Sequence, residues 1–130
     1  MSDFREFEEF IANTKKAQLD YNKFLENFLV NIALDILART KERTPMGETG
    51  FLKKSWHLGP IGRNENELTI ELINSMEYAS FVENGHFTRN RKSWVEGRFM
   101  ATISIDEVES VLEQRYHSEF RNFLSQRGCL

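Results

Sequence analysis

Two carboxylates and an imidazole near the carboxyl end of the chain have the spacing of a helical metal site. Glu109, Glu113 and His117 follow one another at intervals of four residues, so one face of a helix would present all three side chains. Such a face could bind a divalent cation. One face alone rarely completes a zinc site, however, and glutamate-rich faces are common on solvated helices. We therefore expect a solvated surface here, and no metal.

The other side chains with reactive groups lie where packing is the more usual role. Glu83 and His86 are three residues apart, but Gly85 stands between them and is well placed to end a helix. His57 falls in an expected strand, and Cys129, the single cysteine, is next to the carboxyl terminus. Neither a Gly-x-Ser-x-Gly elbow nor a phosphate loop with a Gly-Lys-Ser/Thr ending occurs in the sequence. We therefore expect no catalytic residues and no cofactor, which describes a protein that is not an enzyme.

A cluster of basic and aromatic residues is the strongest candidate for a binding surface. It comprises His86, Phe87, Arg89, Arg91, Lys92, Trp94 and Arg98. Basic residues interleaved with aromatics can bind nucleic acid, or they can bind an acidic protein surface with Trp and Arg as anchors. A solvated loop is the third alternative. We favour a protein interface, and expect an irregular loop over residues 86–93 that is mobile in the isolated subunit and ordered against an acidic neighbour.

Length and composition indicate a globular protein. The chain has 130 residues, of which 40% are hydrophobic and 28% charged, with a formal net charge of −3. This fits a single domain over residues 1–130, with residues 125–130 as a loose tail. The negative charge argues against a dedicated nucleic-acid binder. Because we find no secretory signal and no run near the ~18 apolar residues of a membrane span, we expect synthesis and folding in a cytoplasm.

The first third of the chain has the apolar spacing of a long helix. Apolar residues recur at steps of three and four over residues 3–44, and Pro45 ends the pattern. The polar stretch at residues 13–16 leaves two alternatives, one helix of about 40 residues or a short helix followed by a long one. The unbroken helix would span roughly 60 Å, which is longer than a globule of this size is wide. Part of it would then protrude or lie against another subunit.

The rest of the chain predicts a mixture of strands and helices. Extended segments at residues 52–61 and 68–72 flank a polar loop, which indicates a β-hairpin or small antiparallel sheet. Residues 76–84 fit a short helix that ends at Gly85, and the basic loop follows. Helical spacing returns from Val95 onward as a long amphipathic helix with a possible kink at residues 104–106. The expected fold class is α+β in a single domain.

Two motifs in the middle of the chain resemble a known family. Residues 44–45 and 49–56 form the first motif, residues 78–86 form the second, and residues 94–100 resemble the run that opens the last helix in relatives. The pattern resembles small virion proteins of long-tailed bacteriophages and prophages, namely neck, head–tail joining and tail-completion proteins. The motif positions expected to define the fold are Pro45, Gly50, Leu52, Ser55, Trp56, Tyr78, Ala79, Val82, Glu83 and Gly85.

The resemblance extends over about residues 40–100 and departs at residues 46–48, where many relatives place an acidic residue differently. Its residues also make physical sense without the family. Gly50 and Gly85 suit positive φ. Trp56 and Phe81 are expected to be buried where the hairpin meets the short helix. No catalytic set falls within the motifs, as expected of a part that works by assembly.

The resemblance implies a structural virion protein that forms part of a connector or tail-completion ring. Its partners would be copies of itself and neighbouring connector and tail proteins, with DNA passing nearby without sequence-specific binding, and no membrane. It would be made in the bacterial host cytoplasm and end in the neck or tail end of the virion. The alternatives are a helical adaptor or regulator outside the virion, or a small metal-dependent hydrolase using Glu109, Glu113 or His117.

Overall fold

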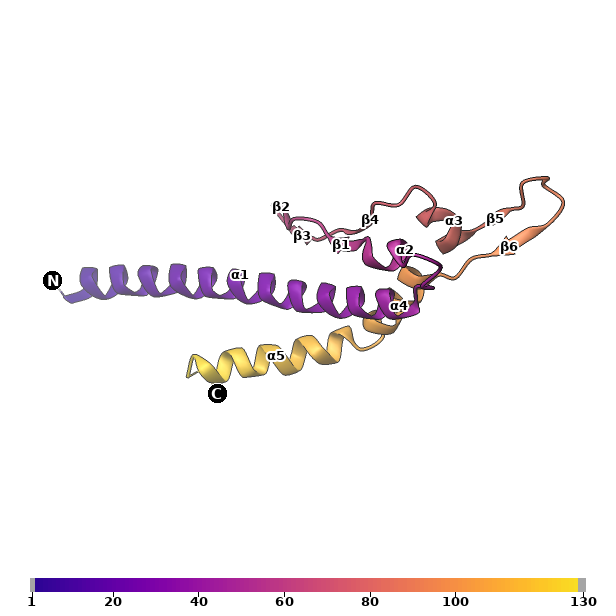
Figure 1. The fold of residues 1–130 in the computed structure, drawn as a ribbon. Coiled ribbons are helices and arrows are strands. Elements are labelled where there is room, and N and C mark those ends of the chain that lie inside the picture. The colour runs from indigo at the N-terminus through magenta and orange to yellow at the C-terminus, as the bar shows by residue number, and fades with distance from the viewer. Residues whose placement is uncertain (1, 129–130) are drawn as a thin grey trace.

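The computed structural model describes residues 2–128. Their elements, in chain order, are α1 (Ser2–Arg43), α2 (Phe51–Lys54), β1 (Trp56–Leu58), β2 (Gly62–Asn64), β3 (Glu67–Thr69), β4 (Leu72–Asn74), α3 (Ala79–Asn84), β5 (Gly85–Phe87), β6 (Trp94–Glu96), α4 (Met100–Glu109) and α5 (Leu112–Gln126) (Figure 1). The α+β class predicted from the sequence is confirmed.

Helix α1 is unbroken over its 42 residues, so the first of the two alternatives is correct. It ends at Arg43, two residues before Pro45. Helix α5 runs back along the middle of α1, and the amino-terminal part of α1 extends beyond it (Figure 1). Residues 4–16 are all exposed. The expectation that part of a long first helix protrudes is confirmed.

The strands form three two-stranded antiparallel sheets. Trp56 in β1 pairs with Asn74 in β4, and Gly62 in β2 pairs with Thr69 in β3, so these four strands make one long interrupted hairpin. The predicted hairpin is confirmed, although residues 52–54, expected to be extended, belong to the helical turn α2. The third sheet pairs β5 with β6.

The core lies where α1 meets α4 and β1. Its apolar residues are Ile32, Ala33, Leu52, Trp56, Met100 and Val108. The Nε1–H of Trp56 donates a hydrogen bond to the buried hydroxyl of Thr44 at 2.8 Å, and that hydroxyl donates to the carbonyl of Thr40 at 2.6 Å. The buried indole nitrogen is therefore satisfied, and the predicted burial of Trp56 is confirmed.

The predicted burial of Phe81 is wrong, because its exposed fraction is 55%. The short helix α3 turns Val82 and Glu83, both half-buried, toward the rest of the protein. Successive residues of a helix are about 100° apart, so Phe81 points away from the face that those two residues share.

The carboxyl-terminal helix is divided, but not where the kink was expected. Ser104 lies inside α4, where its hydroxyl donates to the carbonyl of Met100 at 2.6 Å. The break is at Ser110 and Val111, between α4 and α5. Ser125 and Gln126, expected in a loose tail, are the last residues of α5, and Arg127 pairs with Asp20. Cys129 lies outside the described residues. Across residues 2–128, no helix is both long and apolar enough to span a membrane.

Candidate protein interfaces

The predicted basic cluster lies on a projecting β-hairpin, which we call the arm (residues 85–96). The arm extends away from the helices (Figure 1). The expected loop over residues 86–93 is shorter than predicted, because His86 and Phe87 pair with Val95 and Trp94, and residues 88–93 form the turn between the two strands. The turn between them is also hydrogen-bonded: Thr88 N–H donates to Ser93 O at 2.8 Å, and Lys92 N–H donates to Asn90 Oδ1 at 3.1 Å. These hydrogen bonds order the turn within the single chain, whereas we expected residues 86–93 to become ordered only against a neighbour.

The tip of the arm combines two aromatic rings with three cations. Phe87 and Trp94 face each other edge to face, with ring centroids 5.0 Å apart, although their exposed fractions are 62% and 50%. Arg89, Arg91 and Lys92 are exposed in the turn beside them. Exposed aromatic and arginine side chains are typical anchors of protein interfaces. Five of the seven predicted interface residues therefore lie together at the tip.

The other two predicted interface residues lie at the base of the arm. The ring of His86 is 5.9 Å from that of Phe81, and its Nδ1 is buried with no hydrogen-bond partner among the described residues. Arg98 follows the arm, and its backbone N–H donates to the carbonyl of Val82 at 2.8 Å. The structure does not bring these two residues to the exposed tip.

Two glycines allow close packing at the base of the arm. Gly85 has a φ of +89°, and a Cβ there would lie 2.6 Å from Cζ2 of Trp94. A Cβ on Gly97 would lie 2.4 Å from the carbonyl oxygen of Glu83. The positive φ predicted for Gly85 is confirmed. Gly97 was not identified from the sequence, because nothing local distinguishes it from an ordinary loop glycine.

Glu83 connects the base of the arm to helix α4. Its Oε1 accepts a hydrogen bond from the N–H of Ala101 at 3.0 Å, and its Oε2 accepts from the N–H and the hydroxyl of Thr102 at 2.9 and 2.8 Å. The residue that precedes α4, Phe99, has a φ of 49° and makes no capping hydrogen bond with its side chain. Glu83 thus satisfies amide donors that the first turn of a helix leaves unpaired.

The remaining motif positions surround this region and the core. Gly50 is buried with a φ of +71°, and the buried Leu52 accepts a hydrogen bond from Asn74 Nδ2 at 2.8 Å through its carbonyl. Ser55 follows the last residue of α2, and its backbone N–H donates to the carbonyl of Phe51. The other motif residues are Pro45 and Ala79, both half-buried, and Tyr78, which has an exposed fraction of 42%.

The candidate metal-site residues do not share one helical face. Glu109 is the last residue of α4, whereas Glu113 and His117 are on α5 beyond the break. Glu113 Oε1 and His117 Nε2 are 3.7 Å apart, and both side chains are largely exposed. Within residues 2–128, no three His, Cys, Asp or Glu side chains gather closely enough to hold a metal ion.

An aromatic ladder joins α1 to α5. It consists of Tyr21, Phe24 and Phe28 from α1 and Tyr116, Phe120 and Phe123 from α5. The hydroxyls of Tyr21 and Tyr116 are 2.6 Å apart, and this hydrogen bond, together with burial, raises the pKa of Tyr116 to about 12. Four of the eleven phenylalanines of the sequence are thus used for packing between these two helices.

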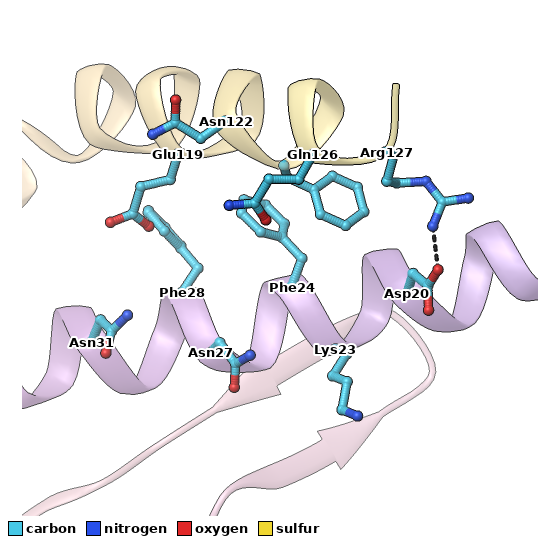
Figure 2. Close-up of a pocket in the computed structure, with 11 residues that line it drawn as sticks. Asp20, Lys23, Phe24, Asn27, Phe28, Asn31, Glu119, Asn122, Gln126 and Arg127 are labelled. Carbon is cyan, nitrogen blue, oxygen red and sulfur yellow. Dashed lines mark hydrogen bonds and ion pairs between the residues drawn. The ribbon is translucent and has the colours of Figure 1, made fainter. Parts of the chain in front are cut away.

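An open groove of about 460 Å³ runs along this ladder. Figure 2 shows Phe24 and Phe28 pointing toward α5 between polar side chains such as Asn27 and Asn122, with the ion pair of Asp20 and Arg127 at one end.

A network of ion pairs connects α1 to α4 and α5. Asp35 accepts from Arg39 at 2.8 Å and from Arg115 at 2.6 Å, while Glu107 accepts from Arg39 at 3.0 Å and also pairs with Arg43. The hydrogen bonds from Arg39 and Arg115 lower the pKa of Asp35, and those from Arg43 and Arg39 lower the pKa of Glu107. The network holds the two carboxyl-terminal helices in place against α1.

The amino-terminal part of α1 is a second exposed apolar surface. Phe4, Phe7, Phe10 and Leu19 have exposed fractions between 58% and 68%. This surface lies where α1 extends past the end of α5 (Figure 1). The sequence predicted a helical stripe of apolar residues here, and the expected length of the helix indicated that part of it would protrude or lie against another subunit.

Comparison with models of protein families matches residues 8–85 to the HK97-gp10-like family, described as "Bacteriophage HK97-gp10, putative tail-component". The match covers more than half of the chain and includes the first sequence motif and residues 78–85 of the second. No curated protein and no solved structure matches the chain at a significant level.

Proposed function

The chain belongs to the HK97-gp10-like family of phage tail components, and we propose that it forms part of a ring at the neck or tail end of a long-tailed phage. The family match confirms the resemblance to phage virion proteins that the motifs indicated. Membership supports a structural role in the virion and contacts with other tail proteins. The ring, the position at the head–tail junction and self-association are the finer parts of the proposal.

The observation that carries the proposal is the amount of surface that the single chain leaves exposed. Its accessible surface is 10038 Å² for a mass of 15.3 kDa. A compact monomer of this mass would expose roughly 7,100 Å². Residues 4–16 of α1 and most residues of the arm are exposed, so much of the chain is shaped for contact with neighbours rather than for packing on itself.

The chemistry of the exposed parts supports the same proposal. Phe7 and Phe10 on α1, and Phe87 and Trp94 on the arm, are all at least half exposed. Clustered apolar side chains on a surface usually mark interaction sites. The two surfaces lie at opposite ends of the molecule (Figure 1), as contacts with different neighbours would require.

We further propose that the chain acts without catalysis, metal or cofactor, and that DNA passes nearby without sequence-specific binding. The net charge of −3 suits a wall that does not hold a duplex, because like charges keep the DNA mobile. Assembly alone would then be the function of the chain.

Complementation of a phage that lacks the gene tests the proposal. We expect particles made without the chain to show heads and tails that are not joined, and a plasmid-borne, epitope-tagged copy to restore joined particles. Immunogold electron microscopy should place the tag at the neck or tail end. Joined, infectious particles in the absence of the chain, or its absence from purified particles, would contradict the proposal.

A further inference from the structure

The end of the β layer opposite the arm carries an acidic surface, which we call the acidic hairpin (residues 62–71). Glu65, Glu67 and Glu71 are all exposed there. The basic residue of the same segment, Arg63, is paired with Glu26 of α1. Three carboxylates are therefore presented outward without a neutralising cation from the hairpin itself.

An apolar hollow lies beside the acidic hairpin. Its volume is about 260 Å³, and its lining includes Leu58, Ile70 and Leu72 from the β layer, together with side chains of α1 and α4. Glu71 lies between two of these lining residues in the sequence, so the acidic hairpin runs directly into the segment that lines the hollow. An acidic surface that adjoins an apolar hollow fits a partner that presents cations next to aromatic rings.

The tip of the arm presents that combination. Arg89, Arg91 and Lys92 are exposed in the turn that follows Phe87 and precedes Trp94, and these two rings are themselves exposed. The arm and the acidic hairpin point in opposite directions from the body of the protein (Figure 1), so the two surfaces cannot meet within one chain. Their complementarity can be used only between two copies.

We propose that the arm of one copy docks on the acidic hairpin and apolar hollow of the next copy. This inference rests on the proposed function, and it names the surfaces that join the ring. Phe87 and Trp94 enter the hollow, while the three cations of the turn face Glu65, Glu67 and Glu71. Each copy then offers one surface and receives the other. Such a head-to-tail contact, repeated with a closing rotation, makes a ring.

Two charge-reversed variants test this pairing in the complementation assay. The arm variant carries Arg89→Glu, Arg91→Glu and Lys92→Glu, and the hairpin variant carries Glu65→Lys, Glu67→Lys and Glu71→Lys. Each variant alone brings like charges together, so each should lower the yield of infectious particles by at least about tenfold. Circular dichroism and thermal melting establish that both variants fold.

Co-expression of the two variants is the decisive measurement. The acidic arm of one variant fits the basic hairpin of the other, and the basic arm of the second fits the acidic hairpin of the first. Alternating copies should therefore restore particle yield, although neither variant does so alone. A control with Lys53→Glu, Lys54→Glu and Arg121→Glu changes the net charge as the arm variant does, at residues outside the arm, the acidic hairpin and the lining of the hollow, and should complement like wild type.

The outcomes separate this inference from the proposed function. If either variant alone complements as well as wild type, or if co-expression fails to restore particles, then the arm does not dock on the acidic hairpin. The proposed function still stands in that case, provided that loss of the gene abolishes joined particles and the wild-type chain restores them. If loss of the gene has no effect on particles, the proposed function itself fails.

Discussion

The carboxylate of Glu83 accepts two hydrogen bonds from Thr102, one from the backbone N–H at 2.9 Å and one from the hydroxyl at 2.8 Å. It therefore caps helix α4, which begins 17 residues later in the chain, and the whole arm lies between Glu83 and that helix in the sequence. Negative charge is favoured at the amino end of a helix, where the backbone N–H groups are unpaired. The contact fixes α3 against α4, and so also fixes the base from which the arm projects.

Removal of this cap should destabilise the fold measurably. We expect Glu83→Ala to lower the free energy of unfolding by about 1–2 kcal/mol, as the loss of a helix cap usually does, and Glu83→Gln to cost less because it keeps an acceptor oxygen. Urea unfolding followed by circular dichroism measures both. Glu77→Ala, which changes an exposed glutamate just before α3, is the matched control. Equal effects of Glu83→Ala and Glu77→Ala would show that the cap does not stabilise the protein.

Two aromatic residues that were both predicted from the sequence to be buried should differ sharply in their contribution to stability. Trp56 is buried and hydrogen-bonded, whereas Phe81 is largely exposed. We expect Trp56→Ala to cost about 3–5 kcal/mol. Phe81→Ala should stay within about 0.5 kcal/mol of the parent, as surface substitutions usually do. Denaturant unfolding checks both, and a cost for Phe81→Ala as large as that for Trp56→Ala would mean that Phe81 is packed in solution.

This pair of aromatics illustrates which features of the fold a sequence can predict. The long helix α1 follows from apolar residues repeated over many turns, and Trp56 was correctly placed in the core. Helix α3 has only six residues, too few for a periodic pattern to show which face is buried. The break between α4 and α5, at Ser110 and Val111, contains neither Gly nor Pro, the residues that usually mark the end of a helix in a sequence.

The candidate interface was predicted by composition, but its geometry was not. The basic and aromatic residues around Arg89 and Trp94 were identified because charge and ring types are visible in the sequence. Their arrangement on a paired hairpin depends on backbone bonds between residues 85–87 and 94–96, which leave no periodic signal in strands of three residues. The role of Glu83 depends on a contact distant in sequence. Such a contact has no local signature.

The ion-pair network predicts a specific response to acid. The pKa values of Asp35 and Glu107 are held below their ordinary values of 3.8 and 4.5. The ionised carboxylates therefore stabilise the folded state fully above these ordinary pKa values. This stabilisation is lost as the pH falls through the lower pKa values of the folded state. We expect the double variant Asp35→Asn, Glu107→Gln to be less stable than wild type at neutral pH. Urea unfolding across acidic pH should show this difference narrowing, and a constant difference would contradict the network.

The hydroxyl pair of the aromatic ladder predicts a response to alkali. The pKa of Tyr116 is raised to about 12 by its hydrogen bond to Tyr21 and by burial. Its contribution to stability is present below the ordinary value of 10 and is lost as the pH rises through the folded value. Ultraviolet absorbance of tyrosinate follows the titration. We expect Tyr21→Phe to bring the pKa of Tyr116 closer to 10, while Tyr78→Phe should leave it unchanged. Identical titration of Tyr116 in wild type and Tyr21→Phe would rule out the hydroxyl contact.

The protruding part of α1 should be important for assembly and nearly irrelevant to folding. Phe7 and Phe10 have exposed fractions of 58% and 67%, so replacing both with Ser removes little buried surface within the chain. We expect the free energy of unfolding to stay within about 0.5 kcal/mol of wild type. In a particle these rings would be covered by a neighbour, and losing them should lower the yield of infectious particles in the complementation assay. Glu6→Ser with Glu9→Ser alters the same stretch of helix without removing apolar surface, and should complement fully. Normal particle yields from the Phe7→Ser, Phe10→Ser variant would mean that these side chains stay solvated in the assembled particle.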